Sequence, residues 1–239
     1  MPYYYGFDMT YIVLVLPCIL FSLWASASVN NTFKRFSTQY ASRGITGAQA
    51  AQRVLNAHGV NNVRVERISG NLTDHFDPKT NVIRLSDNVY DSTSTAAIGV
   101  ACHEAGHAVQ YAQNYFPMQI RAAIIPLTNI GSKLAMPLIL LGVVLTALEY
   151  VSFTFIYLGI GCFALSLLFQ LITLPVEFNA SNRALKAIED YGILTDTELK
   201  GASKTLRAAA MTYVAAVAVS LAQVLRLILI FGGRSRSRD

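Results

Sequence analysis

Long uncharged apolar stretches are the feature that most restricts how this chain can fold. Residues 9–29 form a run of 21 residues without a charge, and a helix of that length crosses a hydrocarbon core about 30 Å thick. Residues 134–176 are apolar for 43 residues apart from Glu149, which lies with Tyr150 near the midpoint. The pattern predicts one membrane span and, further along, a hairpin of two spans with a tight turn at Glu149.

The first apolar run is expected to stay in the mature protein. Ala25-Ser26-Ala27 resembles a signal-peptidase site, but the positive charges Lys34 and Arg35 follow the run instead of preceding it. A cleaved secretory signal has its positive charges before the apolar segment. We therefore interpret this run as an uncleaved anchor.

A third apolar run, residues 208–231, has the length of a span but contains Gln223 and Arg226. Such residues cost a few kcal/mol in lipid unless they reach the interface or face other helices. If this run crosses fully, the arginines of the C-terminal tail emerge on the side opposite the segment that precedes the hairpin. The sequence leaves open a transmembrane, an interfacial or a re-entrant segment.

Composition supports a membrane protein. Hydrophobic residues make up 53% of the chain and charged residues only 14%, against roughly 25% charged residues in soluble domains. The net charge of +5 comes from scattered basic residues, which favours anionic lipid and topology over nucleic acid as its explanation. Of the three cysteines, Cys18 and Cys162 fall within apolar runs, so no disulfide framework is indicated.

The segment between the first span and the hairpin has the character of a small α+β domain. Residues 46–59 have apolar side chains at helical spacing after a capping Thr46. Residues 62–67 and 81–86 alternate as short strands, the second less cleanly, with turn residues at 77–80 between them, so two or three strands are expected. Residues 91–115 begin with capping residues and continue as an alanine-rich helix.

The sequence His103-Glu104-Ala105-Gly106-His107 lies in the middle of this last helix. Residues four apart share one helix face, so the two imidazoles can converge on a single metal ion. Glu104 can reach a water molecule in an open position of that ion and act as its general base. This pattern is typical of zinc peptidases, in which the ion activates water and polarises the scissile carbonyl.

A catalytic zinc needs a third protein ligand, and membrane topology sorts the candidates. Two crossings after His107 return the chain to the same face, so Glu177 can meet the histidines, whereas Glu149 at the hairpin tip cannot. Pro175 suits the start of a new helix, from whose first turn Glu177 would project. The alternatives on the correct face are Glu189, Asp190, Asp91 and His75.

Two further residues near the motif have both a functional and a purely structural interpretation. His75 could stabilise an oxyanion or bind substrate, although a lone loop histidine is more often merely solvated. Gly106 is unfavourable by about 1 kcal/mol in a helix interior, which close backbone packing beneath the metal would explain.

The chain resembles the bacterial membrane-bound neutral zinc metallopeptidases, the YugP-like family, in the segments NLTDHFDP, NVIRLSDNVY, AAIGVACHEAGHAVQ and LPVEFNASNRAL. Similarity to the wider glutamate-ligand zincins, including HtpX-like membrane peptidases, implies zinc held by His103, His107 and Glu177, with Glu104 as base. Those proteins commonly have an acidic residue four positions after the ligand glutamate, where this chain has Ser181, so Ser181 or another residue would support a ligating histidine. The resemblance also suggests that NVIRLS is an edge strand that pairs with extended substrate.

We therefore predict a mainly α, multi-span helical membrane protein with a small α+β zincin-like domain on one membrane face and one Zn²⁺ per chain. Its expected partners are the lipid bilayer and a protein or peptide substrate that is membrane-associated or misfolded, with no nucleic acid. The rival hypothesis is a non-enzymatic zinc-binding membrane scaffold. A transporter is disfavoured because paired charges within the spans are lacking.

Positive charge near the span ends places the predicted site on the cytoplasmic side of the cell membrane. The expected organisation is an N-terminal anchor (1–30), a zincin-like domain (31–133), a transmembrane hairpin (134–176), a third-ligand helical segment (177–207), a C-terminal transmembrane or interfacial helix (208–232) and a basic tail (233–239).

Overall fold

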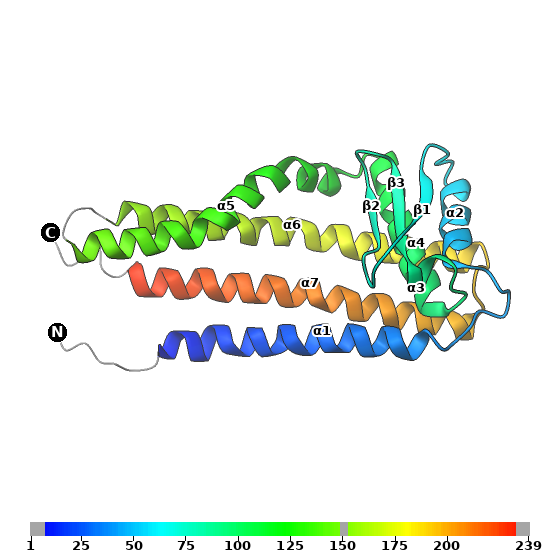
Figure 1. Ribbon diagram of the computed structural model, residues 1–239, viewed down its shortest axis with the longest axis horizontal. Coiled ribbons are helices and arrows are strands. Elements are labelled where there is room, and N and C mark those ends of the chain that lie inside the picture. The colour runs from blue at the N-terminus through cyan, green and yellow to red at the C-terminus, as the bar shows by residue number, and fades with distance from the viewer. Residues whose placement is uncertain (1–7, 149–152, 233–239) are drawn as a thin grey trace. The chain divides into compact units, whose positions relative to one another are not determined.

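The computed structural model describes residues 8–148 and 153–232. Figure 1 shows a mainly helical chain with one small sheet, as the sequence predicts. The elements are η1, a π-helix (Tyr11–Val15), α1 (Leu16–Phe36), α2 (Gly47–Ala57), β1 (Arg64–Ile68), β2 (His75–Asp77), β3 (Val82–Ser86), α3 (Asp87–Tyr90), α4 (Thr95–Ala112), α5 (Phe116–Ala147), α6 (Thr154–Asp190) and α7 (Asp196–Phe231).

Four helical segments of the described chain are long and apolar enough to cross a membrane. They cover Tyr11–Phe36, Phe116–Ala147, Thr154–Asp190 and Asp196–Phe231. The third apolar run is therefore part of one unbroken helix of 36 residues, which rules out the re-entrant alternative. The turn expected at Glu149 and the arginines of the C-terminal tail lie outside the described residues.

Backbone contacts divide the chain into two compact units. The first, the apolar unit, comprises Met1–Trp24, Ile120–Thr173 and Tyr213–Asp239. The second, the site unit, comprises Ala25–Gln119 and Leu174–Thr212. Helices α1, α6 and α7 each contribute residues to both units.

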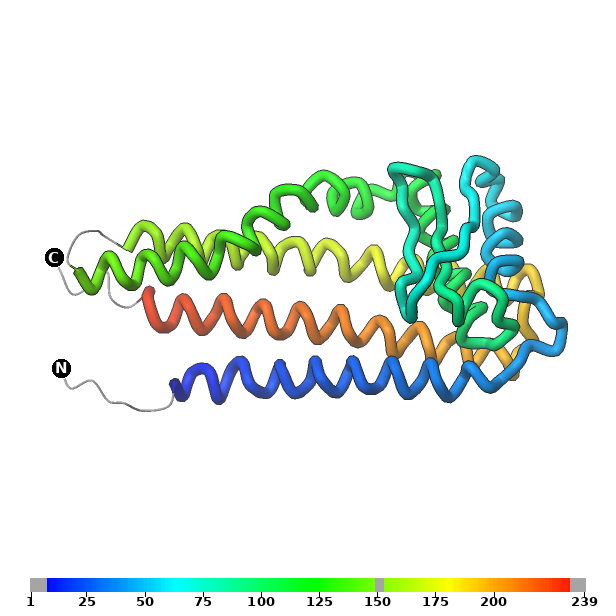
Figure 2. Tube along the Cα trace, in the orientation of Figure 1, coloured from blue at the N-terminus to red at the C-terminus, as the bar shows by residue number. Residues whose placement is uncertain are grey.

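Small residues bring α5 and α6 close together in the apolar unit. A Cβ on Gly159 would lie 2.8 Å from the carbonyl oxygen of Ala135, and one on Gly142 would lie 2.8 Å from the backbone nitrogen of Ile156. Figure 2 shows the traces of the end of α5 and the start of α6 side by side. Close backbone approach at glycine is a common way for membrane helices to associate.

Two pairs of polar side chains form contacts in the apolar unit. The Arg226 guanidinium forms an ion pair with Asp8, with its Nε 2.9 Å from Oδ2. Gln170 on α6 donates a hydrogen bond of 2.7 Å to the hydroxyl of Ser220 on α7. Pairing lowers the cost of placing such groups in an apolar run, which explains how Arg226 is accommodated.

The core of the site unit is built from α2, α4, the sheet and parts of α6 and α7 (Figure 1). Thr46 caps α2 through a capping box with Gln49, in which each side chain bonds the other's backbone N–H. Ser94 caps α4 by accepting from the N–H of Ala97 at 3.2 Å. These caps satisfy N–H groups that the first turn leaves unpaired, and they place the helix starts where the sequence predicts them to within a few residues.

Strand order in the sheet is β1-β3-β2, with β3 parallel to β1 and antiparallel to β2. The expectation that NVIRLS is an edge strand is therefore wrong, because β3 has a partner on each side. Four of the five residues of β3 are buried. A strand buried on both faces lacks the alternation of a strand with one solvent-exposed face, which is why the pattern at residues 81–86 is irregular.

Helix α6 corrects a second expectation. Pro175 does not begin a new helix but lies inside α6, which continues through it to Asp190. Proline in a helix interior removes one backbone hydrogen bond, and helices that cross membranes tolerate this where neighbouring groups compensate. Glu177 consequently projects from the middle of a helix and not from its first turn.

The packing of α4 on α6 depends on Gly106. A Cβ at this position would lie 2.7 Å from the carbonyl oxygen of Ala180, which is too close for any side chain. The two backbones therefore approach each other at the point in α4 between the two histidines. The sequence expectation of close packing beneath the motif is confirmed.

We predict that Gly106→Ala destabilises the protein by about 1–3 kcal/mol, the usual cost of overpacking a core. Gly161→Ala is the matched control, because Gly161 also lies in a helix but a Cβ there meets nothing within 4 Å. Thermal unfolding of both variants in detergent measures the difference. An unfolding temperature for Gly106→Ala as high as that of Gly161→Ala would contradict the close approach.

Candidate metal centre

Helix α4 places His103 and His107 on one face, as their spacing predicts. Their ring centroids are 4.6 Å apart with an angle of 82° between the ring planes. Both side chains are largely buried, with exposed fractions of 14% and 9%. The two rings therefore meet at a common point inside the site unit.

Helix α6 brings the carboxylate of Glu177 to that point. Its Oε2 lies 3.3 Å from Nε2 of His103 and 3.4 Å from Nε2 of His107. Glu177 is 2% exposed. In the described part of the chain, these three residues are the one group of three or more histidine, cysteine or acidic side chains with ligand atoms within 4.8 Å of one another.

The other candidates for a third ligand do not join this group. Asp91 instead accepts a hydrogen bond from Arg67 at 2.8 Å. His75 is exposed in β2, and its Nδ1 lies 2.7 Å from the carbonyl oxygen of Thr73. Glu189 and Asp190 are exposed at the end of α6.

The three donor atoms fit a tetrahedral zinc ion. Two ligand atoms each about 2.0–2.1 Å from a tetrahedral metal are about 3.3–3.4 Å apart, and the Glu177 oxygen lies 3.3 and 3.4 Å from the two nitrogens. Two imidazoles and one carboxylate are also the donor set of many catalytic zinc sites. The fit therefore rests on both spacing and chemistry.

Glu104 lies beside this group without belonging to it. The residue is 8% exposed, and burial raises the pKa of its carboxyl to about 7. The charge of His103 opposes this shift, while the carboxylates of Glu177 and Asp74 add to it and His75 opposes it weakly. A buried carboxyl with a pKa near neutrality can both accept and donate a proton.

Comparison with known proteins decides the family. The family model described as "Putative neutral zinc metallopeptidase" matches residues 11–232. The chain belongs to this family of neutral zinc metallopeptidases. It is also 45% identical over 223 residues to "Putative membrane protease YugP" of Bacillus subtilis (strain 168), with 93% of this chain and 97% of that protein covered. No solved structure matches the chain.

In this family member a serine supports one of the histidines. The hydroxyl of Ser181, one turn after Glu177 on α6, lies 3.1 Å from Nδ1 of His103. Nδ1 of His107 lies 2.9 Å from the side-chain oxygen of Gln110. Both rings are thus held through Nδ1, and their Nε2 atoms face the carboxylate oxygen of Glu177.

Gln110 is the site residue that the sequence analysis missed. A signal was present, because position 110 lies three residues after His107 and so shares its side of the helix. Its partners on α6, however, are 66 and 69 residues away in the sequence. Local spacing alone could not identify them.

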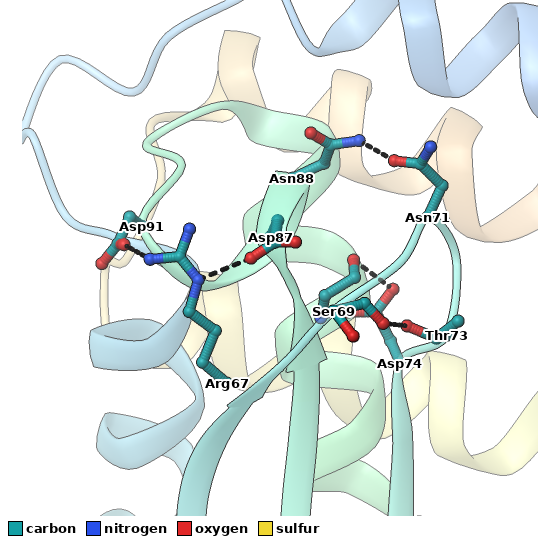
Figure 3. A network of polar contacts seen from close by, with 9 residues as sticks. Arg67, Ser69, Asn71, Thr73, Asp74, Asp87, Asn88 and Asp91 are labelled. Carbon is teal, nitrogen blue, oxygen red and sulfur yellow. Dashed lines mark hydrogen bonds and ion pairs between the residues drawn. The ribbon is translucent and has the colours of Figure 1, made fainter.

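A polar network anchors the segment before β2 (Figure 3). The carboxylate of Asp74 accepts from the backbone N–H of Ser86 at 2.7 Å and from its hydroxyl at 3.0 Å. Burial raises the pKa of Asp74, and these hydrogen bonds from Ser86 oppose the shift. Asn71 accepts a hydrogen bond from Asn88 on α3 in the same network. The segment from Asn71 to Asp74 is therefore tied to the end of β3 and to α3.

We predict that Glu177→Gln weakens zinc binding by more than about 100-fold, because it removes a ligand and not merely a supporting group. Glu189→Gln is the matched control on the same helix and should bind zinc as the wild type does. Zinc content and affinity of the purified variants provide the measurement. Equal zinc binding by both variants would mean that another residue supplies the third ligand.

Proposed function

We propose that this chain is a membrane-embedded zinc endopeptidase with one zinc per chain held by His103, His107 and Glu177. The observation that carries the proposal is the distance of 3.3 and 3.4 Å from the Glu177 oxygen to the two imidazole nitrogens, which suits a tetrahedral ion, next to the buried carboxyl of Glu104, which is not part of this group. A peptidase needs both parts, namely an ion with an open position and a base beside it.

Glu104 is the general base of the proposed reaction. Zinc, when bound, supplies the Lewis acidity that activates water and polarises a peptide carbonyl. The Glu104 carboxylate accepts one proton from the attacking water and passes it to the amide nitrogen as the C–N bond breaks. The products are a carboxylic acid and an amine, so no protein nucleophile is required. The pKa of about 7 for Glu104 suits both halves of this proton transfer.

The rival function is a zinc-binding scaffold without activity. A structural zinc site closes all four positions with protein groups. Among the described residues, the candidate zinc group contains three ligand side chains, those of His103, His107 and Glu177. Glu104 is buried beside them, although this burial raises the pKa of its carboxyl. A scaffold gains nothing from that burial, so the position of Glu104 favours the enzyme.

We further propose a multi-pass protein whose site unit lies on the cytoplasmic side. The support is the positive charge near the ends of the apolar runs on that side. The residues concerned are Lys34, Arg35, Arg43, Arg121, Lys133, Arg183, Lys186, Lys200, Lys204 and Arg207. Cysteine labelling at engineered positions in the loops and the tail tests this topology.

The proposed substrates are membrane-associated or misfolded membrane proteins cut close to the bilayer. The support is that Glu177 directly follows, in the sequence, an apolar run that ends at Val176. Membrane proteomes of cells that carry the wild type or Glu104→Gln test this class. If no membrane protein accumulates in the variant cells, the substrate proposal fails.

We predict that Glu104→Gln lowers peptidase activity by at least about 100-fold, at the lower end of what loss of a general base costs, while zinc binding is retained. Cleavage of casein or an unfolded membrane protein measures activity, and metal analysis measures zinc. Glu66→Gln, which changes an exposed glutamate on β1, is the control. The scaffold would be supported if wild type and both variants retained zinc and all three had the same peptidase activity, or if all three retained zinc and had no peptidase activity.

A further inference from the structure

Gln110 connects His107 to α6 through both ends of its side-chain amide. It is fully buried on α4. Its oxygen lies 2.9 Å from Nδ1 of His107. Its NH₂ group donates to the backbone carbonyl of Val176 and to the side-chain oxygen of Asn179, both at 2.9 Å.

The surroundings determine which way this amide points. The Val176 carbonyl can only accept a hydrogen bond. The Asn179 oxygen is also fixed as an acceptor, because Arg183, which can only donate, bonds to it through Nε at 2.7 Å. The NH₂ group of Gln110 must therefore face α6. Reversing the amide would place its oxygen against two other oxygens.

A fixed amide determines the protonation of one imidazole nitrogen. An amide oxygen only accepts, so Nδ1 of His107 must carry the hydrogen in their contact. Nε2 of a neutral His107 then keeps its lone pair, which is the form that binds zinc. The hydroxyl of Ser181 can donate or accept, so its contact with His103 imposes no such choice.

We propose that Gln110 is a positioning residue that holds His107 as the Nδ1-protonated tautomer, with the amide direction set by Val176 and by Arg183 acting through Asn179. This inference rests on the proposed zinc site. It predicts that zinc affinity depends on a hydrogen-bond acceptor at position 110 and not merely on a side chain of that size.

Two substitutions separate these alternatives. Gln110→Met keeps the length of the side chain but offers Nδ1 no oxygen. Gln110→Glu keeps an acceptor for Nδ1 but replaces the donor to Val176 and Asn179 with an oxygen, so it loses the link to α6 as the methionine variant does. If Gln110 only joined α4 to α6, the two variants would be equally impaired in zinc binding, whereas tautomer control impairs the methionine variant more.

The test is the zinc dissociation constant of the full-length protein in detergent, measured by competition with a chelator. Gln110→Met should weaken zinc binding about 10–100-fold, the range for loss of a group that orients a metal ligand, and Gln110→Glu should weaken it distinctly less, because an oxygen still faces Nδ1. Gln52→Met is the control. The side-chain amide of Gln52 donates to Asn56 on the same helix, α2, so the substitution removes a hydrogen bond away from the metal group. Melting temperatures of the metal-free forms show whether each variant is folded.

A second readout keeps the proposal testable if Gln110→Met does not fold. This readout is the nitrogen NMR spectrum of the zinc-loaded wild type with ¹⁵N-labelled histidines, to which the four histidine side chains contribute signals. The His107 signals should show a hydrogen on Nδ1 and zinc on Nε2. Zinc bound through Nδ1 would overturn the proposal, as would equal weakening or no weakening in both Gln110 variants. A wild type that binds no zinc would instead reject the proposed function itself.

Discussion

The close approach of α4 and α6 at Gly106 is the constraint on which the site depends. Only a residue without Cβ allows the carbonyl of Ala180 to lie where it does. That contact sits one turn from Glu177 and within the helical turn that joins the two histidines. Packed helices usually lie 8–10 Å apart, depending on the side chains at their contact. A glycine at the contact allows a closer approach, which lets side chains from α4 and α6 meet at one point. The same approach lets the Gln110 amide reach the backbone of α6.

The site concentrates ionisable groups where burial is costly. Two carboxyls and two imidazoles lie together in a buried region of the site unit. Such an arrangement is unfavourable unless the groups are paired with hydrogen bonds, opposite charge or a metal ion. Hydrogen bonds with the Ser181 hydroxyl and the Gln110 side-chain oxygen account for the outer nitrogens of the rings. A divalent cation would account for the inner atoms, which is why the fold and the metal are expected to depend on each other.

Much of this arrangement can be predicted from the sequence because it is encoded locally. Helical spacing places His103 and His107 on one face, and counting membrane crossings favours Glu177 over Glu149 while leaving other candidates on the same face open. The support for the rings is different, since Gln110 finds its partners only when α4 packs on a helix about 70 residues away. The sequence also suggested a helix start at Pro175 and an edge strand at residues 81–86. The first failed because α6 continues through Pro175 where neighbouring helices pack against it, and the second, which the family resemblance had suggested, failed because β3 has a strand on each side.

X-ray absorption at the zinc edge on purified full-length protein tests the central claim most directly. One zinc per chain should be surrounded by four nitrogen or oxygen atoms at about 2.0–2.1 Å, with scattering from two imidazole rings. A sulfur neighbour or a third imidazole would contradict a peptidase centre built from His103, His107 and Glu177.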